Sequence, residues 1–346
     1  MRIQFDVTHP AHVHLFRHAI YALCRDGHTV GVTTREKEIT TRLLDAYNIE
    51  HTVLSTQAET PLGLATEWGL REIRTLRYAR KFDPDVIVSR LNPPAVHAAA
   101  AVGAGSIVFH DHEQANTLAR LTAPLTDRFC TPSGYDADLG EPHRRYEGYH
   151  ELAYLHPNWF TPDRSVLESH GIDPDDRFFV LRFVSMQAHH DIGRNGLSRR
   201  AKKQIATELS KHGTVYVSNE DDLPPAFNAK HVPVPPEDIH HLLAYSSLLV
   251  TDSNTMATEA ALLGTPVVRS NSFAENGLSN FVELGSYGLV RSFNDETNAL
   301  NAATEIAQDR SANGTWTDRR DELLETKIDV TSYMLEQIQE VAETNA

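Results

Sequence analysis

The segment LLVTDSNTMATEAALLGTPVVR at 248–269 combines a phosphate-binding pattern with a carboxylate at a set distance from it. Ser253 and Thr255 are small hydroxyl residues at a predicted helix start, where free backbone N–H groups and the helix dipole attract a phosphate. Glu259 follows about 9 Å along the helix, close to the span from a diphosphate to the ribose hydroxyls. The pattern suits a nucleoside diphosphate. The alternative is that Ser253 is only an N-cap and Glu259 only a solvated helix residue.

Three histidines, His9, His12 and His14, follow the opening strand, where ligands meet open α/β sheets. A histidine there can act as a general base or donate to a substrate oxygen, because its pKa lies near working pH. We therefore expect His12 in catalysis and His9 against the sugar nucleotide. Two alternatives are a metal site completed by Asp6 and simple packing or capping of the next helix. Pro10 and the lack of a G-x-G-x-x-G motif argue against a nicotinamide-dependent dehydrogenase.

A denser polar cluster follows the strand predicted at 106–110. Its members can form hydrogen bonds or titrate, and they are more numerous than a turn requires. They are His110, Asp111, His112, Glu113, Gln114 and Asn116. We expect Asp111 and Glu113 to take part in catalysis.

Two loops in the second half of the chain carry residues of similar kinds. The first follows a predicted strand and contains Ser185, His189 and His190, which should reach one edge of its sheet. We expect Ser185 to bind the sugar nucleotide and His189 to be catalytic; a mobile polar loop is the alternative. The second loop offers Asn276 and Asn280 as donors to a sugar or phosphate, close in topology to the helix start at 253.

The elements that must position these residues are short, β-branched strands that alternate with helical patterns. Strands are predicted at 3–7, 29–33, 52–54, 85–89, 106–110, 178–184, 214–218, 231–234, 248–252 and 266–269. Most are wholly apolar, as expected where helices cover both faces of a parallel sheet. We predict an N-terminal Rossmann-like acceptor domain over 1–160 and a C-terminal Rossmann-like nucleotide-sugar-binding domain over 161–318. A helix over 319–346, with its apolar pattern at 319–343, should pack back on the first domain.

Composition excludes several classes of protein. The net charge of −15 makes nucleic acid an improbable partner, because phosphate backbones demand a basic surface. No apolar run is long enough to span a bilayer, so we expect a cytoplasmic protein. Cys24 and Cys130 match no zinc or disulfide pattern, and we expect two buried thiols. Only seven of the 32 basic residues are lysine, which fits a halophilic, archaeal source.

One charged helix, LREIRTLRYARKF at 70–82, has two interpretations. Its basic residues recur every three or four positions beside leucine and isoleucine, so the helix could lie on an anionic membrane. They are Arg71, Arg74, Arg77, Arg80 and Lys81. The alternative is a solvated helix face with an ordinary apolar stripe.

Several segments resemble the family catalogued as domain of unknown function 354, which is common in archaea. They are FDVTHPAHVHLF, GYHELAYLHPNWFTPD, LRFVS, PPEDIHHLL and TDSNTMATEAALLGTPVVR. The resemblance covers nearly the whole chain. It implies a GT-B architecture, with two doubly wound Rossmann-like domains facing a cleft, related to UDP-sugar glycosyltransferases and non-hydrolysing UDP-N-acetylglucosamine 2-epimerases.

The resemblance also implies roles for single residues. Ser253 and Thr255 would match the epimerases' diphosphate contacts, with Asn254 where those motifs carry glycine, and Glu259 would match their ribose-binding glutamate. Glu113 resembles the catalytic glutamate of their His-x-Glu-Ala-Gly loop. His189 or its neighbour stands where those enzymes have a histidine.

The leading hypothesis is a metal-independent glycosyltransferase that needs no cofactor and uses a nucleoside-diphosphate sugar, of the UDP-sugar class. His12 or Glu113 would activate the acceptor hydroxyl, and the helix start would stabilise the departing diphosphate. The second hypothesis is an epimerase in which Asp111, Glu113 and His189 handle the protons. The third is a non-catalytic nucleotide-sugar-binding protein. The basic helix leaves open a lipid-linked acceptor and peripheral contact with the inner face of the membrane; the oligomeric state is unknown.

Overall fold

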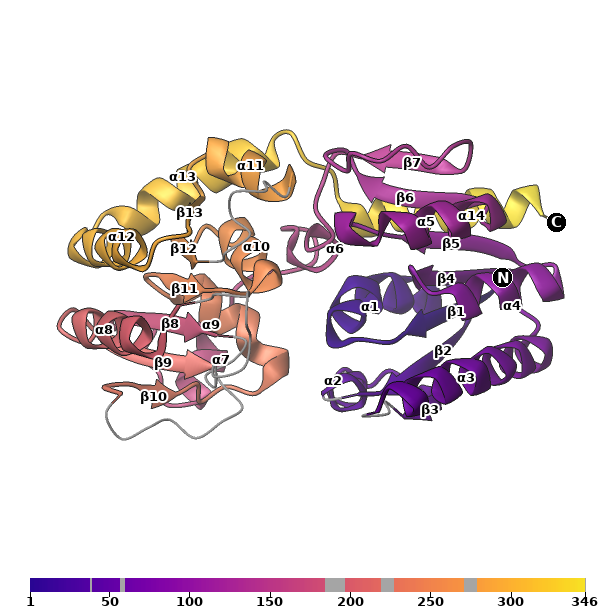
Figure 1. The fold of residues 1–346 in the computed structure, drawn as a ribbon, viewed down its shortest axis with the longest axis horizontal. Coiled ribbons are helices and arrows are strands. Elements are labelled where there is room, and N and C mark those ends of the chain that lie inside the picture. Colours follow the sequence, from indigo (N-terminus) through magenta and orange to yellow (C-terminus); the bar gives the residue numbers. More distant parts are fainter. Residues whose placement is uncertain (38, 57–59, 184–196, 219–226, 271–278, 346) are drawn as a thin grey trace. The chain divides into compact units, whose positions relative to one another are not determined.

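The computed structural model describes residues 1–345 except 38, 57–59, 184–196, 219–226 and 271–278. The chain folds into two compact units (Figure 1). Unit 1 contains residues 1–159 and 328–346, and unit 2 contains residues 160–327. The chain therefore leaves unit 1 after Trp159 and returns to it at Ile328.

Unit 1 is built on a parallel sheet in the order β3-β2-β1-β4-β5-β6-β7. The strands are β1 (Arg2–Val7), β2 (Thr29–Glu36), β3 (Thr52–Thr56), β4 (Val86–Arg90), β5 (Gly105–Phe109), β6 (Arg128–Pro132) and β7 (His143–Tyr146). All of β5, and all of β1 except Arg2, is buried. Continuous burial of this kind is what a parallel sheet covered by helices on both faces requires.

Helices connect these strands and cover the sheet. They are α1 (Pro10–Arg25), α2 (Thr40–Ala46), α3 (Pro61–Phe82), α4 (Pro93–Val102), α5 (Asn116–Thr122), α6 (Leu152–Leu155) and α14 (Val330–Thr344), with 3₁₀ turns η1 (Glu113–Ala115) and η2 (Ala123–Leu125). α14 comes from the far end of the sequence and packs against α1, β4 and β5. The approach of α14 to β5 is close enough that a Cβ at Gly105 would collide with Val341.

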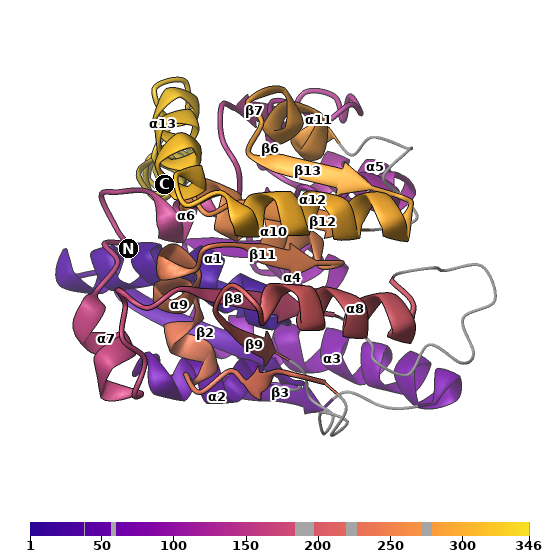
Figure 2. The same ribbon diagram turned by 90° about the vertical axis from the view of Figure 1, so that its left-hand side faces the viewer.

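Unit 2 repeats the architecture with a parallel sheet in the order β10-β9-β8-β11-β12-β13. Its strands are β8 (Phe178–Arg182), β9 (Thr214–Ser218), β10 (Lys230–His231), β11 (Leu249–Thr251), β12 (Val267–Ser270) and β13 (Val290–Phe293). Its helices are α7 (Arg164–Ser169), α8 (Arg199–Leu209), α9 (Ile239–Tyr245), α10 (Asn254–Leu262), α11 (Ser279–Ser286), α12 (Glu296–Gln308) and α13 (Ala312–Leu324), with the 3₁₀ turn η3 (Pro236–Asp238). Figure 2 shows α8 and α12 side by side along this sheet. The doubly wound α/β prediction is confirmed for both units.

Three strands, β6, β7 and β13, were not predicted from the sequence. Their sequences are RFCTP, HRRY and VRSF, and each contains arginine or proline within a short run. β7 and β13 lie at sheet edges, and β6 lies next to an edge. A search for continuous apolar runs misses all three strands, because charged or polar residues interrupt each run.

The helix predicted as one run at 319–343 is divided between the units. α13 ends at Leu324, and α14 begins after Asp329, whose carboxylate accepts a hydrogen bond from the Ser332 N–H at 3.0 Å. Asp329 also accepts from Asn158 and Trp159, so it caps α14 and holds the outgoing chain of unit 1. The prediction of two buried thiols was wrong for Cys24, which is exposed on α1.

No helix in the described part of the chain is long and apolar enough to cross a membrane. The helix predicted at 70–82 lies within α3, and two of its cations act inside unit 1. Arg71 is buried and bonded to Asp6, and Arg74 donates to the Leu54 carbonyl at 2.8 Å. The face is therefore less basic than its sequence suggests, with Arg77, Arg80 and Lys81 left exposed.

Candidate functional site

The carboxyl ends of four strands of unit 1 bring polar side chains together. Arg90 ends β4, Asp111 follows β5, and His150 lies shortly after β7. His12 stands in the first turn of α1, after β1. The charges of Arg90, Asp111 and His150 all act on the pKa of His12, so these four side chains form one cluster, called here the edge cluster.

Asp111 joins two members of the edge cluster. Its Oδ2 lies 2.8 Å from His150 Nδ1, and its Oδ1 accepts a hydrogen bond from Arg90 Nη2. Burial acts to raise the pKa of Asp111, but the Arg90 guanidinium and His150 outweigh it and hold this pKa well below the usual value. Asp111 is therefore an anion. Arg90 Nη1 also lies 2.8 Å from His150 Nδ1, and this nitrogen cannot both accept from Arg90 and donate to Asp111. Because Arg90 already donates to Asp111 through Nη2, we assign the proton of His150 to Nδ1, which donates to Asp111 Oδ2.

His150 then presents an unprotonated Nε2. The side chain is only 4% exposed, and Nε2 has no hydrogen-bond partner among the described residues. The hydroxyl of Tyr146, whose ring stacks on His150, is also buried without a partner among them. Burial lowers the pKa of His150 and opposes its protonation, although Asp111 acts in the other direction. A neutral histidine oriented by a carboxylate is the arrangement of a general base.

His12 has the opposite hydrogen-bonding arrangement. Its Nδ1 accepts from the Thr8 N–H at 3.3 Å, which leaves the proton of a neutral ring on Nε2. Burial, followed by the Arg90 guanidinium, holds the pKa of His12 well below its usual value. This geometry favours His12 as a hydrogen-bond donor, one of the two roles expected from the sequence, and His150 as the base. The predicted catalytic role of His12 stays a prediction.

The other predicted residues of unit 1 lie around the edge cluster. His9 caps α1, with its Nδ1 accepting from the Ala11 N–H at 3.2 Å, and its ring centroid lies 5.8 Å from that of His12. His14 is buried against the rings of Tyr47 and Tyr154.

Two predicted residues of the loop at 110–116 lie in different surroundings. His110 turns inward against Phe129, and burial lowers its pKa to about 3. Glu113 lies in η1, and its predicted catalytic role stays a prediction.

A second layer of polar residues supports the carboxyl end of β1. The Asp6 carboxylate is fully buried and accepts two hydrogen bonds from Arg71 Nη2, at 2.6 and 2.9 Å. It also accepts from Thr33 at 2.7 Å and from Asn92. Asp6 is therefore fully engaged in joining β1 to α3, and it does not complete a metal site with the histidines. Among the described residues no group of histidine, cysteine and acidic side chains is arranged to hold a metal ion.

In unit 2 the predicted phosphate-binding residues begin α10. Ser253 is the N-cap, and its Oγ accepts from the Met256 N–H at 3.4 Å. Asn254 and Thr255 are exposed in the first turn. The Glu259 carboxylate is buried, and its Oε1 lies 3.0 Å from His240 Nε2. Its predicted ribose contact stays a prediction.

Some of the other predicted residues of unit 2 lie outside the described residues. Asn280 is partly exposed in α11. Ser185, His189 and Asn276 lie outside the described residues.

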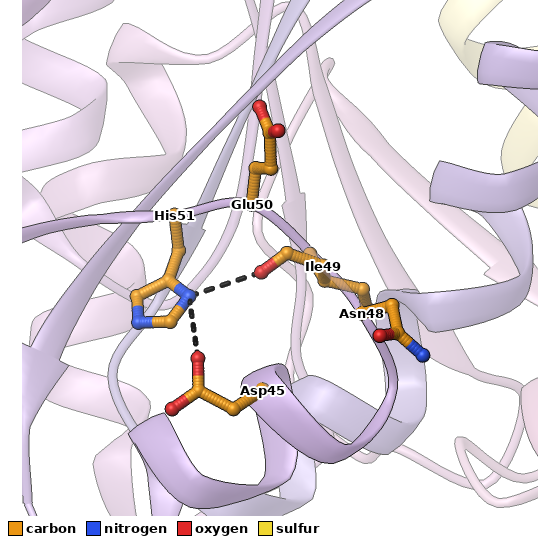
Figure 3. Close-up of a pocket in the computed structure, with 5 residues that line it drawn as sticks. All are labelled: Asp45, Asn48, Ile49, Glu50 and His51. Atoms are coloured by element: carbon orange, nitrogen blue, oxygen red, sulfur yellow. Dashed lines mark hydrogen bonds and ion pairs between the residues drawn. The ribbon is translucent and has the colours of Figure 1, made fainter.

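A surface pocket lies away from all these residues. Asp45, Asn48, Ile49, Glu50 and His51 line it at the amino end of β3 (Figure 3). In Figure 3 Asp45 and His51 point toward one another, and Glu50 points away. The amino ends of parallel strands form the edge opposite to the edge cluster, so this pocket is not part of the candidate site.

Sequence reasoning missed Arg90 and His150. His150 follows β7, a strand that the sequence did not reveal, so the end of that strand was not considered. Arg90 ends a strand that was predicted, and its position alone was a signal that could have found it.

Comparison with known proteins places this geometry in a family and a fold. The family model "Protein of unknown function (DUF354)" matches residues 1–343. No curated protein matches the sequence.

Similar solved structures include a putative UDP-N-acetylglucosamine 2-epimerase from Listeria monocytogenes, with TM-score 0.66 and 13% identity over 91% of this chain and 90% of that one. They also include glycosyltransferase VinC in complex with DTDP, with TM-score 0.65 and 14% identity over 99% and 100% of the two chains. Acinetobacter baumannii MurG has TM-score 0.60 and 13% identity over 98% and 100%. The GT-B fold is thereby confirmed.

Proposed function

The chain belongs to the DUF354 family, whose description names no activity, and we propose that it is a metal-independent glycosyltransferase with a UDP-sugar or similar donor. The likeness in fold to glycosyltransferases and sugar-nucleotide epimerases supports a sugar nucleotide as the ligand. The proposal assigns the acceptor to unit 1 and the sugar nucleotide to unit 2.

The Asp111–His150 pair is the observation that carries the proposal. The acceptor hydroxyl would donate its proton to His150 Nε2 as its oxygen forms a bond to the anomeric carbon of the donor. The bond from that carbon to the diphosphate breaks, and the diphosphate leaves with the electron pair. Asp111 would stabilise the imidazolium that forms, and the His12 N–H would orient the acceptor.

The start of α10 would receive the developing charge of the diphosphate. Its first-turn N–H groups point toward any anion at the helix terminus, and Ser253 and Thr255 add hydroxyl groups. This is the role that a divalent cation takes in other phosphate-leaving reactions. Glu259 is proposed as the ribose contact of the same ligand.

One observation favours a transferase over the epimerase. Epimerisation through Asp111 needs that carboxylate to accept a proton from carbon, but its low pKa makes it a weak base. In the epimerase hypothesis Glu113 and His189 would then have to carry out the proton transfers without Asp111. A non-catalytic binding protein, in turn, has no need of an unpartnered Nε2 oriented by a carboxylate.

The test is to incubate the purified protein with UDP-, GDP-, CDP- and dTDP-sugars and to follow the sugar and the free nucleotide by mass spectrometry. We expect slow release of one nucleoside diphosphate, with water as acceptor, and its loss in His150→Gln. His170→Gln is the matched control, because His170 forms a similar pair with Asp238 on the surface of unit 2 at 3.2 Å. An isomerised sugar, or equal release by His150→Gln and the wild type, would contradict the transferase.

The proposal extends to a lipid-linked acceptor met at a membrane surface. Leu70 and Ile73 are exposed on α3, on the same side of the helix as Arg77, Arg80 and Lys81. Apolar and basic residues on one face suit an anionic bilayer. We expect co-sedimentation with anionic vesicles that falls when Ile73 and Arg77 are both replaced by serine; unchanged partitioning would remove this part of the proposal.

A further inference from the structure

Arg269 on β12 is a buried cation without a counterion among the described residues. It is 2% exposed and is the largest fully buried side chain among the described residues. Its Nε donates to Asn254 Oδ1 at 3.0 Å and its Nη1 to Ser292 Oγ at 3.4 Å, both neutral oxygens. No described carboxylate forms an ion pair with it. Burial lowers the pKa of Arg269 to about 10, so the group is still charged at neutral pH.

An isolated charge of this kind is costly in a folded protein. Buried charges are normally paired, because removal from water is not offset by neutral hydrogen bonds alone. The guanidinium is nevertheless held firmly, with its central carbon 4.0 Å from the centre of the Phe281 ring. Its Nη2 has no hydrogen-bond partner among the described residues. A firmly oriented cation that has no counterion, and one donor nitrogen without a partner, among the described residues is what an anion site presents before its ligand binds.

The guanidinium lies beside a second source of positive potential, the amino end of α10. Asn254, which accepts from Arg269 Nε, is the first residue of α10, a helix of nine residues. The amino end of that helix carries a partial positive charge and unsatisfied N–H groups. Two positive groups at one place repel each other unless an anion lies beside both.

We propose that Arg269 and the amino end of α10 together bind the diphosphate of the sugar nucleotide, with Asn254 as the positioning residue that orients the guanidinium. This inference rests on the proposed function for the identity of the ligand. In this arrangement the carboxamide oxygen of Asn254 is the fixed acceptor for Nε. The arrangement also gives the leaving diphosphate a full positive charge in addition to the helix dipole.

The test measures binding of inorganic pyrophosphate and UDP by calorimetry at constant ionic strength, together with the melting temperature of the unliganded protein. In Arg269→Met we expect about 10- to 100-fold weaker binding, the loss of one charge-assisted contact. We also expect an unchanged or higher melting temperature without ligand, because an unpaired charge is gone. A purely structural arginine would give a lower one. Arg291→Met is the control, since Arg291 lies on the adjacent strand β13 and pairs with Glu305 at 3.2 Å.

Asn254→Asp provides a second test that keeps Arg269 in place. The new carboxylate would supply the missing counterion, so we expect a higher melting temperature and weaker pyrophosphate binding. Wild-type binding by Arg269→Met would overturn the inference. If Arg269→Met does not fold, wild-type values for both measurements in Asn254→Asp would overturn it.

The outcome is separable from that of the proposed function. Arg269-dependent pyrophosphate binding without turnover of any sugar nucleotide would support the anion site and contradict the transferase. Turnover of a sugar nucleotide together with pyrophosphate binding that does not depend on Arg269 would support the transferase and contradict the anion site.

Discussion

Each unit contains a buried pair of one histidine and one carboxylate, and the two pairs differ in which imidazole nitrogen meets the acid. In unit 1 Asp111 contacts His150 through Nδ1, and Nε2 is left without a partner among the described residues. In unit 2 Glu259 contacts His240 through Nε2, between helices α10 and α9. Their side chains are 6% and 1% exposed, whereas that of Asp111 is 21% exposed. In the proposed function the unit 1 pair therefore supplies the base, whereas the unit 2 pair joins two helices and holds the carboxylate proposed to contact the ribose.

The largest effect should come from removing the two histidines separately. His150→Gln should lower turnover by about 10²- to 10⁴-fold, the usual contribution of a general base, with little change in stability. His240→Gln should instead destabilise unit 2 and lower turnover per folded molecule much less, because His240 only positions Glu259. Steady-state rates combined with urea unfolding of both variants test the comparison, which fails if the two variants lose turnover equally.

Replacing Arg90 tests whether His150 is the base of the edge cluster. Burial lowers the pKa of His150, and the positive charge of Arg90 lowers it further. The wild type should therefore keep its activity as the pH falls through 6.5. In Arg90→Met the pKa of His150 should rise, and the acidic limb of kcat/KM should move to higher pH. We expect the maximal rate to fall about 10-fold, the effect of a misplaced base. A pH profile that does not move would show that His150 is not the titrating group.

Glu259→Gln should reveal what the unit 2 pair contributes to stability. The amide keeps the size of the side chain but loses the charge, so a hydrogen bond to a charged group is weakened at a buried site. We expect a loss of about 1–3 kcal/mol in the free energy of unfolding, measured with urea. Glu283→Gln is a control at a more exposed carboxylate, 39% exposed, which pairs with Lys327. Equal losses in the two variants would contradict a special role for burial at Glu259.

An effect confined to acidic pH concerns the stability of unit 1. The pKa of His110 is lowered to about 3 by burial, and that of His18 to about 4, again chiefly by burial. Between these values and 6.5 the unfolded chain binds protons that the folded chain does not, so stability falls as the pH falls. The slope for one such histidine approaches about 1.4 kcal/mol per pH unit. His110→Gln should flatten this dependence in urea unfolding between pH 6.5 and 4.5.

The sequence predicts the architecture better than it predicts the site. Buried parallel strands such as β1 and β5 are apolar along their length, and that pattern is visible without a structure. His150 was missed because β7 reads HRRY, an edge strand with no apolar run. Arg269 was missed because nothing in the local sequence distinguishes a buried arginine from an exposed one; only its contacts with Asn254 of α10 and Phe281 of α11 do. His12 and Asp111 were found because they directly follow strands that were themselves predicted.

The return of α14 to unit 1 has a consequence for synthesis of the chain. Unit 2 is one continuous segment, whereas unit 1 needs residues from both ends of the sequence. Val330, Met334, Ile338 and Val341 of α14 are buried in unit 1. Until they emerge from the ribosome, the surface of α1 and β5 that they cover stays open to water and to other chains. Unit 2 can therefore be complete before unit 1 is, and residues 1–159 of a nascent chain stay partly uncovered until α14 is made.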